Sequence, residues 1–231
     1  LAQSDDVVGV ILRIDSPGGT FSGSEALYSA LRRLADAKPT VAVIDGVGAS
    51  GAYMAAIAAD HIVARAGSIT GSVGVIMQIP NMTGLLTSIG VNMQEIRSGP
   101  LKATPSPFEE TSDASRAAAE SIVLDLFDQF LGMVTERREI SEAALTAVKS
   151  GQVFTGKQAL PLGLIDALGG ETEARLWLVG KKVEIGVPIR DAEQPDDTEV
   201  FRDLLRRIGG VTLMGAQPAL DGPWAIWQHT I

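Results

Sequence analysis

The sequence lacks cysteine entirely and contains few aromatic residues. Without a single Cys in 231 residues, structural disulfides and Cys-based metal sites are excluded. Aromatic residues make up only 5% of the chain and the formal net charge is −9, so neither a base-stacking surface nor a basic stripe for nucleic acid is indicated. We therefore expect no nucleic-acid partner, no metal and no cofactor.

Long apolar runs are missing as well. The longest stretch without a charged residue, 66–94, is interrupted by glycine, proline and asparagine. A membrane-spanning helix needs about 20 predominantly apolar residues, so this stretch is interpreted as protein interior or subunit interface. The chain begins with "LAQSDDVVGVILRID", almost directly on a strand pattern and without a signal peptide. We therefore expect a soluble fragment of a longer protein, with any membrane anchor outside this chain.

The residues that are present predict an α/β protein with an extension. Of the chain, 45% is hydrophobic and 20% is charged, which suits one core domain. Apolar runs and helical periodicity alternate as far as residue 97, and the pattern is then helical from 107 to 149. Strands are predicted at 7–15, 40–45, 61–65, 71–77 and 91–97, and helices at 22–37, 50–60, 81–90, 171–178 and 198–208. Residues 1–188 are predicted to form the core, and 189–231 a linker, an amphipathic helix and a tail with Trp224 and Trp227.

One serine stands among unusually small neighbours. The stretch "GVGASGAYMAA" (46–56) places Ser50 between a β-branched run and an Ala-rich helical run. Small residues let the backbone turn sharply and let another group come close. A serine on such a strand-to-helix turn is one way to present a nucleophile, but it then needs a base from elsewhere in the chain.

Candidate bases for Ser50 are few. Of the two histidines, His61 lies in a predicted buried strand and His229 is third from the end, so a structural role is favoured for both. Among the lysines, Lys102 stands out, because "RSGPLKATPSPF" has no acidic residue before Glu109. A lysine acts as a base near neutral pH only if its pKa falls from about 10.4 to about 7–8, which burial can achieve. The residues alone leave two readings of Lys102 open, a base and a solvated loop lysine.

Donors for an oxyanion are also present. The "DSPGG" stretch (15–19) follows a predicted strand and can point backbone N–H groups into a cleft. The amide of Gly51, directly after Ser50, is a natural second donor. The order strand, "SPGG", helix, strand, "GVGASG", helix is more specific than either glycine motif alone.

Several motifs together resemble a known family. "LRIDSPGG", "GVGASGAYMAA", "ITGSVGVI", "SGPLKATPSPF" and "VFTGKQALPLGLID" occur in the order and spacing of the signal peptide peptidase A family. The resemblance implies an α/β fold of the ClpP/crotonase type, a superhelix of repeated β-β-α units with a helical C-terminal portion. It also implies a serine/lysine dyad of Ser50 and Lys102, with Ser72 orienting the lysine. The oxyanion donors it implies are Gly19, favoured over Gly18, and Gly51.

The resemblance carries further expectations about context. It implies a bacterial membrane protease whose catalytic domain faces the extracytoplasmic side and which degrades remnant signal peptides. It implies a homo-oligomer in which the serine of one protomer meets the lysine of another. Three alternatives remain at this point: a ClpP-type Ser-His-Asp peptidase, a crotonase-like acyl-CoA enzyme and a non-catalytic membrane scaffold of the same fold. The presence of only two histidines argues against the first of these.

Overall fold

A computed structural model describes residues 1–192 of the chain. These residues belong to two units: a compact unit, Ala2–Val183, and a second unit made of Leu1 and the chain from Glu184 onward. The compact unit contains every helix and strand described below. The predicted helix 198–208, Trp224, Trp227 and His229 lie outside the described residues, and the predicted boundary at residue 188 stays a prediction.

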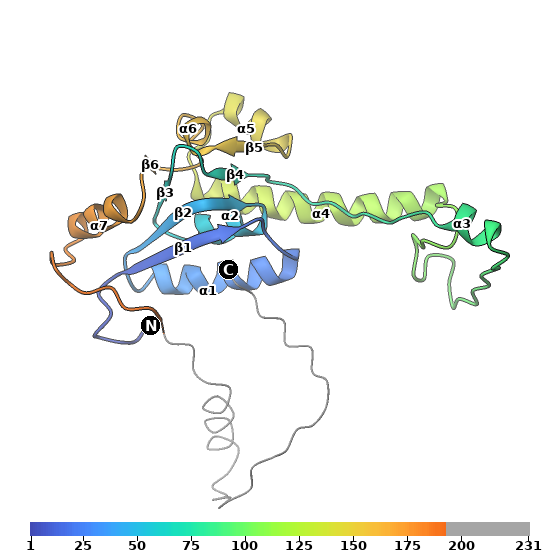
Figure 1. Cartoon of the computed structure of the whole chain (residues 1–231), viewed down its shortest axis with the longest axis horizontal. Helices are drawn as coiled ribbons and strands as arrows, with labels where there is room; N and C mark the ends of the chain where they lie inside the picture. The colour runs from blue at the N-terminus through green and yellow to red at the C-terminus, as the bar shows by residue number, and fades with distance from the viewer. Residues whose placement is uncertain (193–231) are drawn as a thin grey trace, which may run out of the picture. The chain divides into compact units, whose positions relative to one another are not determined.

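A six-stranded sheet forms the centre of the compact unit (Figure 1). The long strand β2 pairs in parallel with β1 on one side, while on the other side its first half pairs with β3 and its second half with β4. Strand β6 continues the sheet beyond β3, and β5 adds to β4 in the antiparallel sense. The strands are β1 (Val10–Ser16), β2 (Thr40–Ala49), β3 (His61–Ala64), β4 (Ile69–Gly71), β5 (Val153–Thr155) and β6 (Ala167–Leu168). The mixed α/β class predicted from the sequence is confirmed.

Seven helices accompany these strands in the described part of the chain: α1 (Phe21–Ala35), α2 (Gly51–Ile57), α3 (Thr83–Ser88), α4 (Asp113–Arg137), α5 (Glu142–Lys149), α6 (Gly156–Ala159) and α7 (Glu171–Gly180). Serine caps begin two of them, because the Ser112 and Ser141 hydroxyls accept hydrogen bonds from the backbone N–H groups of Ser115 and Ala144. Within the described residues no helix is long and apolar enough to cross a membrane.

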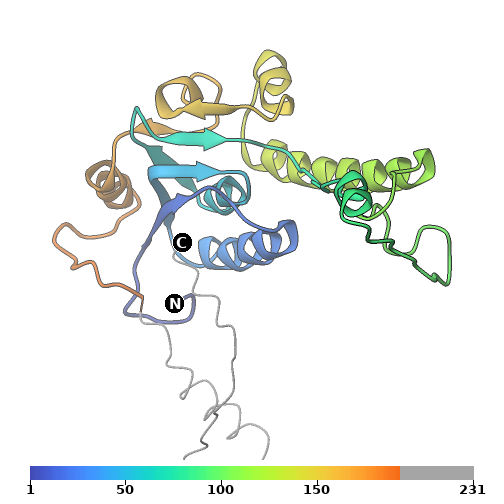
Figure 2. The same cartoon turned by 45° about the vertical axis from the view of Figure 1, so that its right-hand side comes forward.

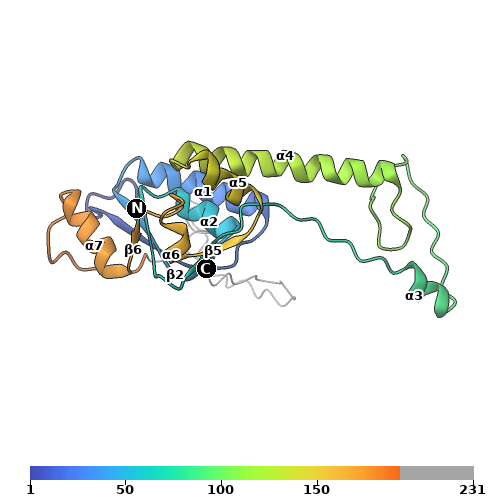
Figure 3. The same cartoon turned by 90° about the horizontal axis from the view of Figure 1, so that it is seen from above.

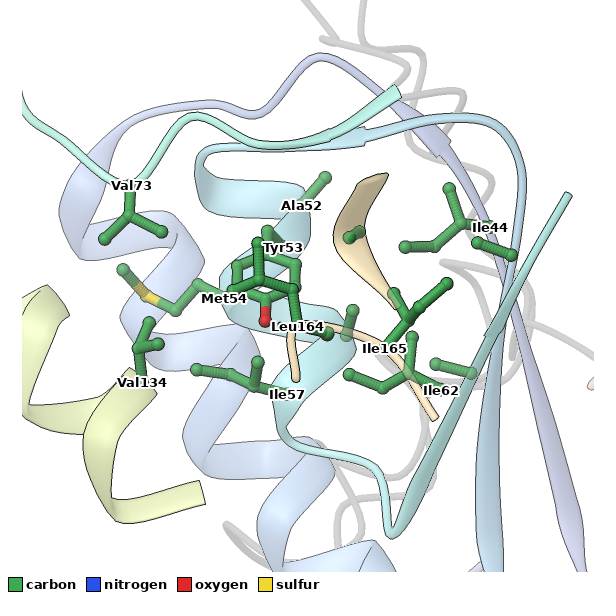
Figure 4. Close-up of a cluster of buried hydrophobic side chains, with 14 of the residues drawn as sticks. Ile44, Ala52, Tyr53, Met54, Ile57, Ile62, Val73, Val134, Leu164 and Ile165 are labelled. Atoms are coloured by element: carbon green, nitrogen blue, oxygen red, sulfur yellow. Dashed lines mark hydrogen bonds between the residues drawn. The ribbon is translucent and has the colours of Figure 1, made fainter. Parts of the chain in front are cut away.

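The alternation of side chains along β2 divides the core between the two faces of the sheet. Ala42 and Ile44 belong to the main hydrophobic cluster with α2, which Figure 4 shows around Tyr53. Val41 and Val43 face the other way and pack with α7. The buried Tyr53 hydroxyl donates to the backbone oxygen of Leu164 at 2.8 Å, so its polar end is satisfied within the core. Helix α2, which begins directly after Ser50, is therefore packed within the core.

The part of the compact unit between the two core anchors Val73 and Phe130 is built differently. We call residues 74–129 the arm. Its first segment leads away from the sheet (Figure 2). Helix α3 and the loop before α4 lie at the end of α4 that is far from α2 (Figures 1 and 3). Every residue of the arm is described, and none of its hydrophobic side chains is buried, whereas Phe130 and Val134 of α4 join the main core.

Two strand predictions are wrong in this region. Residues 91–97, "VNMQEIR", form no strand in the described structure. A strand needs a partner for its backbone groups and a surface for its apolar face, and here Val91, Met93 and Ile96 are all exposed, Ile96 by 99%. The strand predicted at 71–77 overlaps β4 (Ile69–Gly71) only at Gly71. After Gly71 the chain places Val73 in the core and then leaves the sheet.

Candidate active site

Ser50 occupies a strained turn between β2 and α2. Its backbone dihedrals are φ 54° and ψ −124°, a conformation that residues other than glycine rarely adopt. The Ser50 amide donates to the Gly71 carbonyl at 2.8 Å, and the Ser50 carbonyl accepts from Met54 at 3.0 Å in the first turn of α2. Its side chain neither caps α2 nor has a hydrogen-bond partner among the described residues, so the hydroxyl is available for chemistry.

The "SPGG" loop lies directly against this turn. Gly18 has φ +116°, and a Cβ atom on it would stand 2.9 Å from the Gly51 nitrogen and 2.9 Å from the Ser50 Cβ. A Cβ atom on Gly51 would likewise stand 3.1 Å from the Gly19 nitrogen. The fold thus brings together Ser50 and the three glycines predicted as oxyanion donors, and at Gly18 the separation from the serine turn is one that only glycine permits.

The side chain of Ser24 lies beside the same glycines. Ser24 is buried, and its hydroxyl donates to the Thr20 carbonyl at 2.9 Å. The N-cap of α1 is Thr20, and Ser24 lies in the first turn of this helix. Its hydroxyl would be 2.1 Å from a Cβ atom on Gly51, so Ser24 closes the space behind the serine turn.

Gly51→Ala is therefore expected to remove activity and lower stability, because the new methyl collides with the Ser24 hydroxyl at 2.1 Å. Overpacking of this kind costs about 1–3 kcal/mol. The double variant Gly51→Ala/Ser24→Ala should recover part of both losses, since the nearest remaining atom is the Ser24 Cβ at 3.0 Å. Peptide cleavage and thermal unfolding measure the two effects. Gly67→Ala is the matched control, because nothing lies within 4 Å of its added Cβ. Unchanged activity in Gly51→Ala would contradict the close contact.

Ser72 directly follows β4, the strand next to the serine turn. It follows Gly71, whose carbonyl receives the Ser50 amide, and β4 pairs with the end of β2 through Gly71 and Ala49. Its own backbone is at φ 52°, and its amide donates to Gln152 at 2.9 Å. The fold therefore brings Ser72 close to Ser50, as the sequence-based assignment of both to one site requires.

His61 lies at the opposite end of the sheet from Ser50. It pairs with Val41 at the start of β2, whereas Ser50 follows the end of that strand, about 30 Å further along the chain direction. Its ring stacks on Trp177 at 5.1 Å between centroids, and Nδ1 lies 3.6 Å from an Asp166 carboxylate oxygen. Burial lowers the pKa of His61, and the Asp166 carboxylate opposes that shift. This histidine joins β3 to α7 and is not placed to act on Ser50.

Lys102 belongs to the exposed loop at the far end of the arm. Its amide donates to the Gly99 carbonyl at 3.1 Å, and its side chain has no partner among the described residues. The views of Figures 1 and 3 agree that the loop between α3 and α4 is separated from α2 by the length of α4. A helix of 25 residues is about 37 Å long. Within one protomer the structure does not bring Lys102 and Ser50 together.

Backbone strain coincides with the candidate residues. Among residues 1–192, the non-glycine residues with positive φ are Ser50, Ser72, Ala103 and Lys182, so two are candidate site residues and a third is next to Lys102. Such conformations cost of the order of 1–3 kcal/mol and cluster at functional sites. The sequence predicted a sharp turn at Ser50, but nothing in it predicted strain at Ser72 or Ala103.

An α/β sheet with a half-buried serine on a strained strand-to-helix turn beside a glycine loop defines a hydrolase-like site. The chain belongs to peptidase family S49, whose family model matches residues 32–184. The matched range includes Ser50, Ser72 and Lys102.

Several known proteins similar to this chain carry protease names. A provisionally named protease of Synechocystis sp. is 38% identical over 207 residues, covering 87% of this chain and 71% of that protein. A provisionally named signal peptide peptidase SppA of Enterococcus faecium is 30% identical over 174 residues, covering 74% of this chain. The chain spans only 51% of the length of the Enterococcus protein.

Among solved structures, an enoyl-CoA hydratase/isomerase family member is similar at 18% identity, with a TM-score of 0.41 over 78% of this chain and 60% of that one. The likeness is too weak to bear on activity.

Proposed function

We propose that this chain is the catalytic part of a serine endopeptidase with Ser50 as nucleophile and Lys102 as general base. Membership of a peptidase family supports peptide-bond hydrolysis in general. The finer assignment is supported above all by one observation: Ser50 has an unpartnered hydroxyl on a strained turn, with the "SPGG" loop packed against it at glycine-only distances. A turn required only for packing would not need a serine there.

In the proposed reaction, a neutral lysine amine accepts the Ser50 proton while Oγ attacks the carbonyl carbon of the scissile peptide. Backbone N–H groups of Gly51 and of Gly19 or Gly18 stabilise the oxyanion of the tetrahedral intermediate. The lysine then gives its proton to the leaving amine as the C–N bond breaks. Water, deprotonated by the same lysine, hydrolyses the acyl ester and restores Ser50. In this scheme Ser72 donates to or accepts from the lysine and fixes its orientation.

The lysine in this scheme comes from a neighbouring protomer. The separation of the Lys102 loop from α2 by the length of α4 supports this assignment. The arm supports it too, because a stretch of chain without a buried hydrophobic side chain has large apolar residues facing outward. Ile76, Ile89, Ile96 and Leu124 are between 60% and 99% exposed. Exposed apolar surface of this extent typically belongs to an interface, and a second copy of the chain is the proposed partner.

The proposed setting is a bacterial membrane, with the catalytic part on the extracytoplasmic side and the anchor supplied by chain outside this sequence. The proposed substrates are remnant signal peptides and other unfolded or apolar peptides. The name of the Enterococcus relative supports this substrate class. The absence of charge from 66 to 94, a stretch that passes Ser72, also suits an apolar peptide.

Labelling with a serine-directed phosphonate tests the proposal. The purified chain is expected to gain one phosphonyl group, located by peptide mass spectrometry on Ser50, and to lose peptidase activity in step with labelling. The Ser50→Ala variant should remain unlabelled, while the exposed Ser22→Ala should label like the wild type. An acyl-CoA enzyme or a scaffold would not react at Ser50, so an unlabelled Ser50 in an active preparation would overturn the assignment.

A further inference from the structure

A single arginine joins the two ends of the loop that carries Lys102. The Arg97 guanidinium donates to both carboxylate oxygens of Glu109, at 2.9 and 3.1 Å. It also donates through Nε to Glu95 at 2.8 Å, and a second nitrogen forms a short hydrogen bond to the same carboxylate oxygen. Glu95 precedes the loop and Glu109 follows it, so the arginine bridges the entry and the exit of residues 98–108.

Further hydrogen bonds connect this bridge to the loop itself. The buried Ser106 hydroxyl donates to the other Glu95 oxygen at 3.2 Å and accepts from the Phe108 amide at 3.3 Å. Inside the loop, the Lys102 amide donates to Gly99. We call Arg97, Glu95, Glu109 and Ser106 the loop clamp.

The clamp stands where the protein has no hydrophobic core. None of the hydrophobic side chains of the arm, residues 74–129, is buried, although all of these residues are described. By contrast, the Arg97 side chain is only 17% exposed, next to Ile96 at 99%. Hydrogen bonds with Glu109 and Glu95 raise the pKa of Arg97 above its ordinary value, so its charge persists throughout the pH range of a folded protein. Ion pairs and hydrogen bonds therefore connect the two ends of the Lys102 loop within a protomer, with no buried hydrophobic side chain in the arm beside them.

We propose that Arg97 is a positioning residue for the reaction: it closes the loop at its base and so holds Lys102 in the geometry that proton transfer requires. This inference rests on the proposed role of Lys102. A general base is effective only when its nitrogen meets the nucleophile at hydrogen-bond distance, and misplacement by about 1 Å can cost about 100-fold in rate. Without Arg97, the Glu95 and Glu109 carboxylates at the two ends of the loop would face each other and repel.

Arg97→Gln is therefore expected to lower kcat about 10- to 100-fold while changing KM less than about 3-fold, since the change affects the base and not the peptide-binding surface. The double variant Arg97→Gln/Glu109→Gln should recover part of the loss, because it removes the unpaired carboxylate along with the arginine. A residue needed only for folding would lower the amount of active enzyme and leave the kcat of the folded fraction unchanged. Active-site titration with the phosphonate counts that fraction.

The matched control is Arg175→Gln, which breaks an exposed ion pair with Glu171 of the same kind, 2.8 Å long, on α7. Its kcat should equal that of the wild type. Hydrogen exchange gives an independent readout: loop amides, including those of Lys102 and Phe108, should exchange faster in Arg97→Gln and not in Arg175→Gln. Should Arg97→Gln fail to assemble, Arg97→Lys keeps the charge, loses the double contact and should show a smaller loss of kcat.

The outcomes separate this inference from the function on which it rests. If Lys102→Ala remains active, the proposed base is wrong. If Lys102→Ala is inactive but Arg97→Gln keeps the wild-type kcat with unchanged loop exchange, the base stands and the positioning role of Arg97 is overturned. Equal loss of activity in Arg97→Gln and Arg175→Gln would also overturn it.

Discussion

Ser50→Gly is expected to abolish peptide cleavage and at the same time to stabilise the protein. Removing the nucleophile of a linked nucleophile–base pair costs about 10⁶-fold in kcat. Ser50 is held at φ 54° and ψ −124°, where a side chain is strained by about 1–3 kcal/mol. Glycine removes that strain, which stabilises the folded state. It also raises the entropy of the unfolded chain, which lowers stability by about 0.5–1 kcal/mol. The free energy of unfolding should therefore rise by about 1 kcal/mol, as measured by denaturant titration.

Ser50→Ala is the matched comparison, because it removes the same hydroxyl but keeps the Cβ atom and the strain. It should be as inactive as Ser50→Gly and no more stable than the wild type. Activity above a few per cent in either variant would show that another residue is the nucleophile. Equal stability of the glycine and alanine variants would show that the turn is not strained.

Mixing two inactive variants is expected to restore activity. Ser50→Ala lacks the nucleophile and Lys102→Ala lacks the base, and each should lose nearly all cleavage when assembled alone. In an equimolar co-assembled mixture, a site is complete when a chain with an intact serine lies beside a chain with an intact lysine. For a cyclic arrangement with one such contact per chain, roughly a quarter of the sites should be active. Cleavage of a fluorogenic peptide by refolded mixtures measures the fraction.

The control mixture combines Lys102→Ala with the double variant Ser50→Ala/Lys102→Ala. It contains intact serines but no intact lysine, so it should remain inactive. Mass spectrometry of intact assemblies verifies that the chains have mixed. Absence of recovery in verified mixed assemblies would mean that each chain supplies its own base, and the sharing of sites between protomers would be abandoned.

The sequence was informative where local chemistry determines the backbone. Small residues around Ser50 predicted a sharp turn, and the structure has that turn, with Gly18 so close to Ser50 and Gly51 that it does not tolerate a Cβ atom. The strands that form the centre of the sheet were also predicted, since buried parallel strands are continuous apolar runs. The assignment of Ser50, Lys102 and Ser72 to catalytic roles stays a prediction.

The sequence was uninformative where structure depends on contacts far apart in the chain. A strand was predicted at 91–97, but a local pattern does not reveal whether a neighbouring strand is present, and none pairs with this segment in the described structure. The loop of Lys102 was interpreted as poor in acidic neighbours. Folding places Glu95 and Glu109 together on Arg97 at its base. The opposite charges at the two ends of the Lys102 loop could have predicted this ion pair, but the sequence analysis did not use them.

The distance between the Lys102 loop and α2 within one protomer has a kinetic consequence under the proposed mechanism. A newly made chain carries a serine without its lysine and a lysine without its serine, so it does not cleave the peptides around it. In dilute protein the rate of cleavage would rise with at least the square of the chain concentration, and it would become proportional to concentration only after assembly is complete. Cleavage would then begin only above a threshold level of expression, and below that level the cell would contain the protein without its activity.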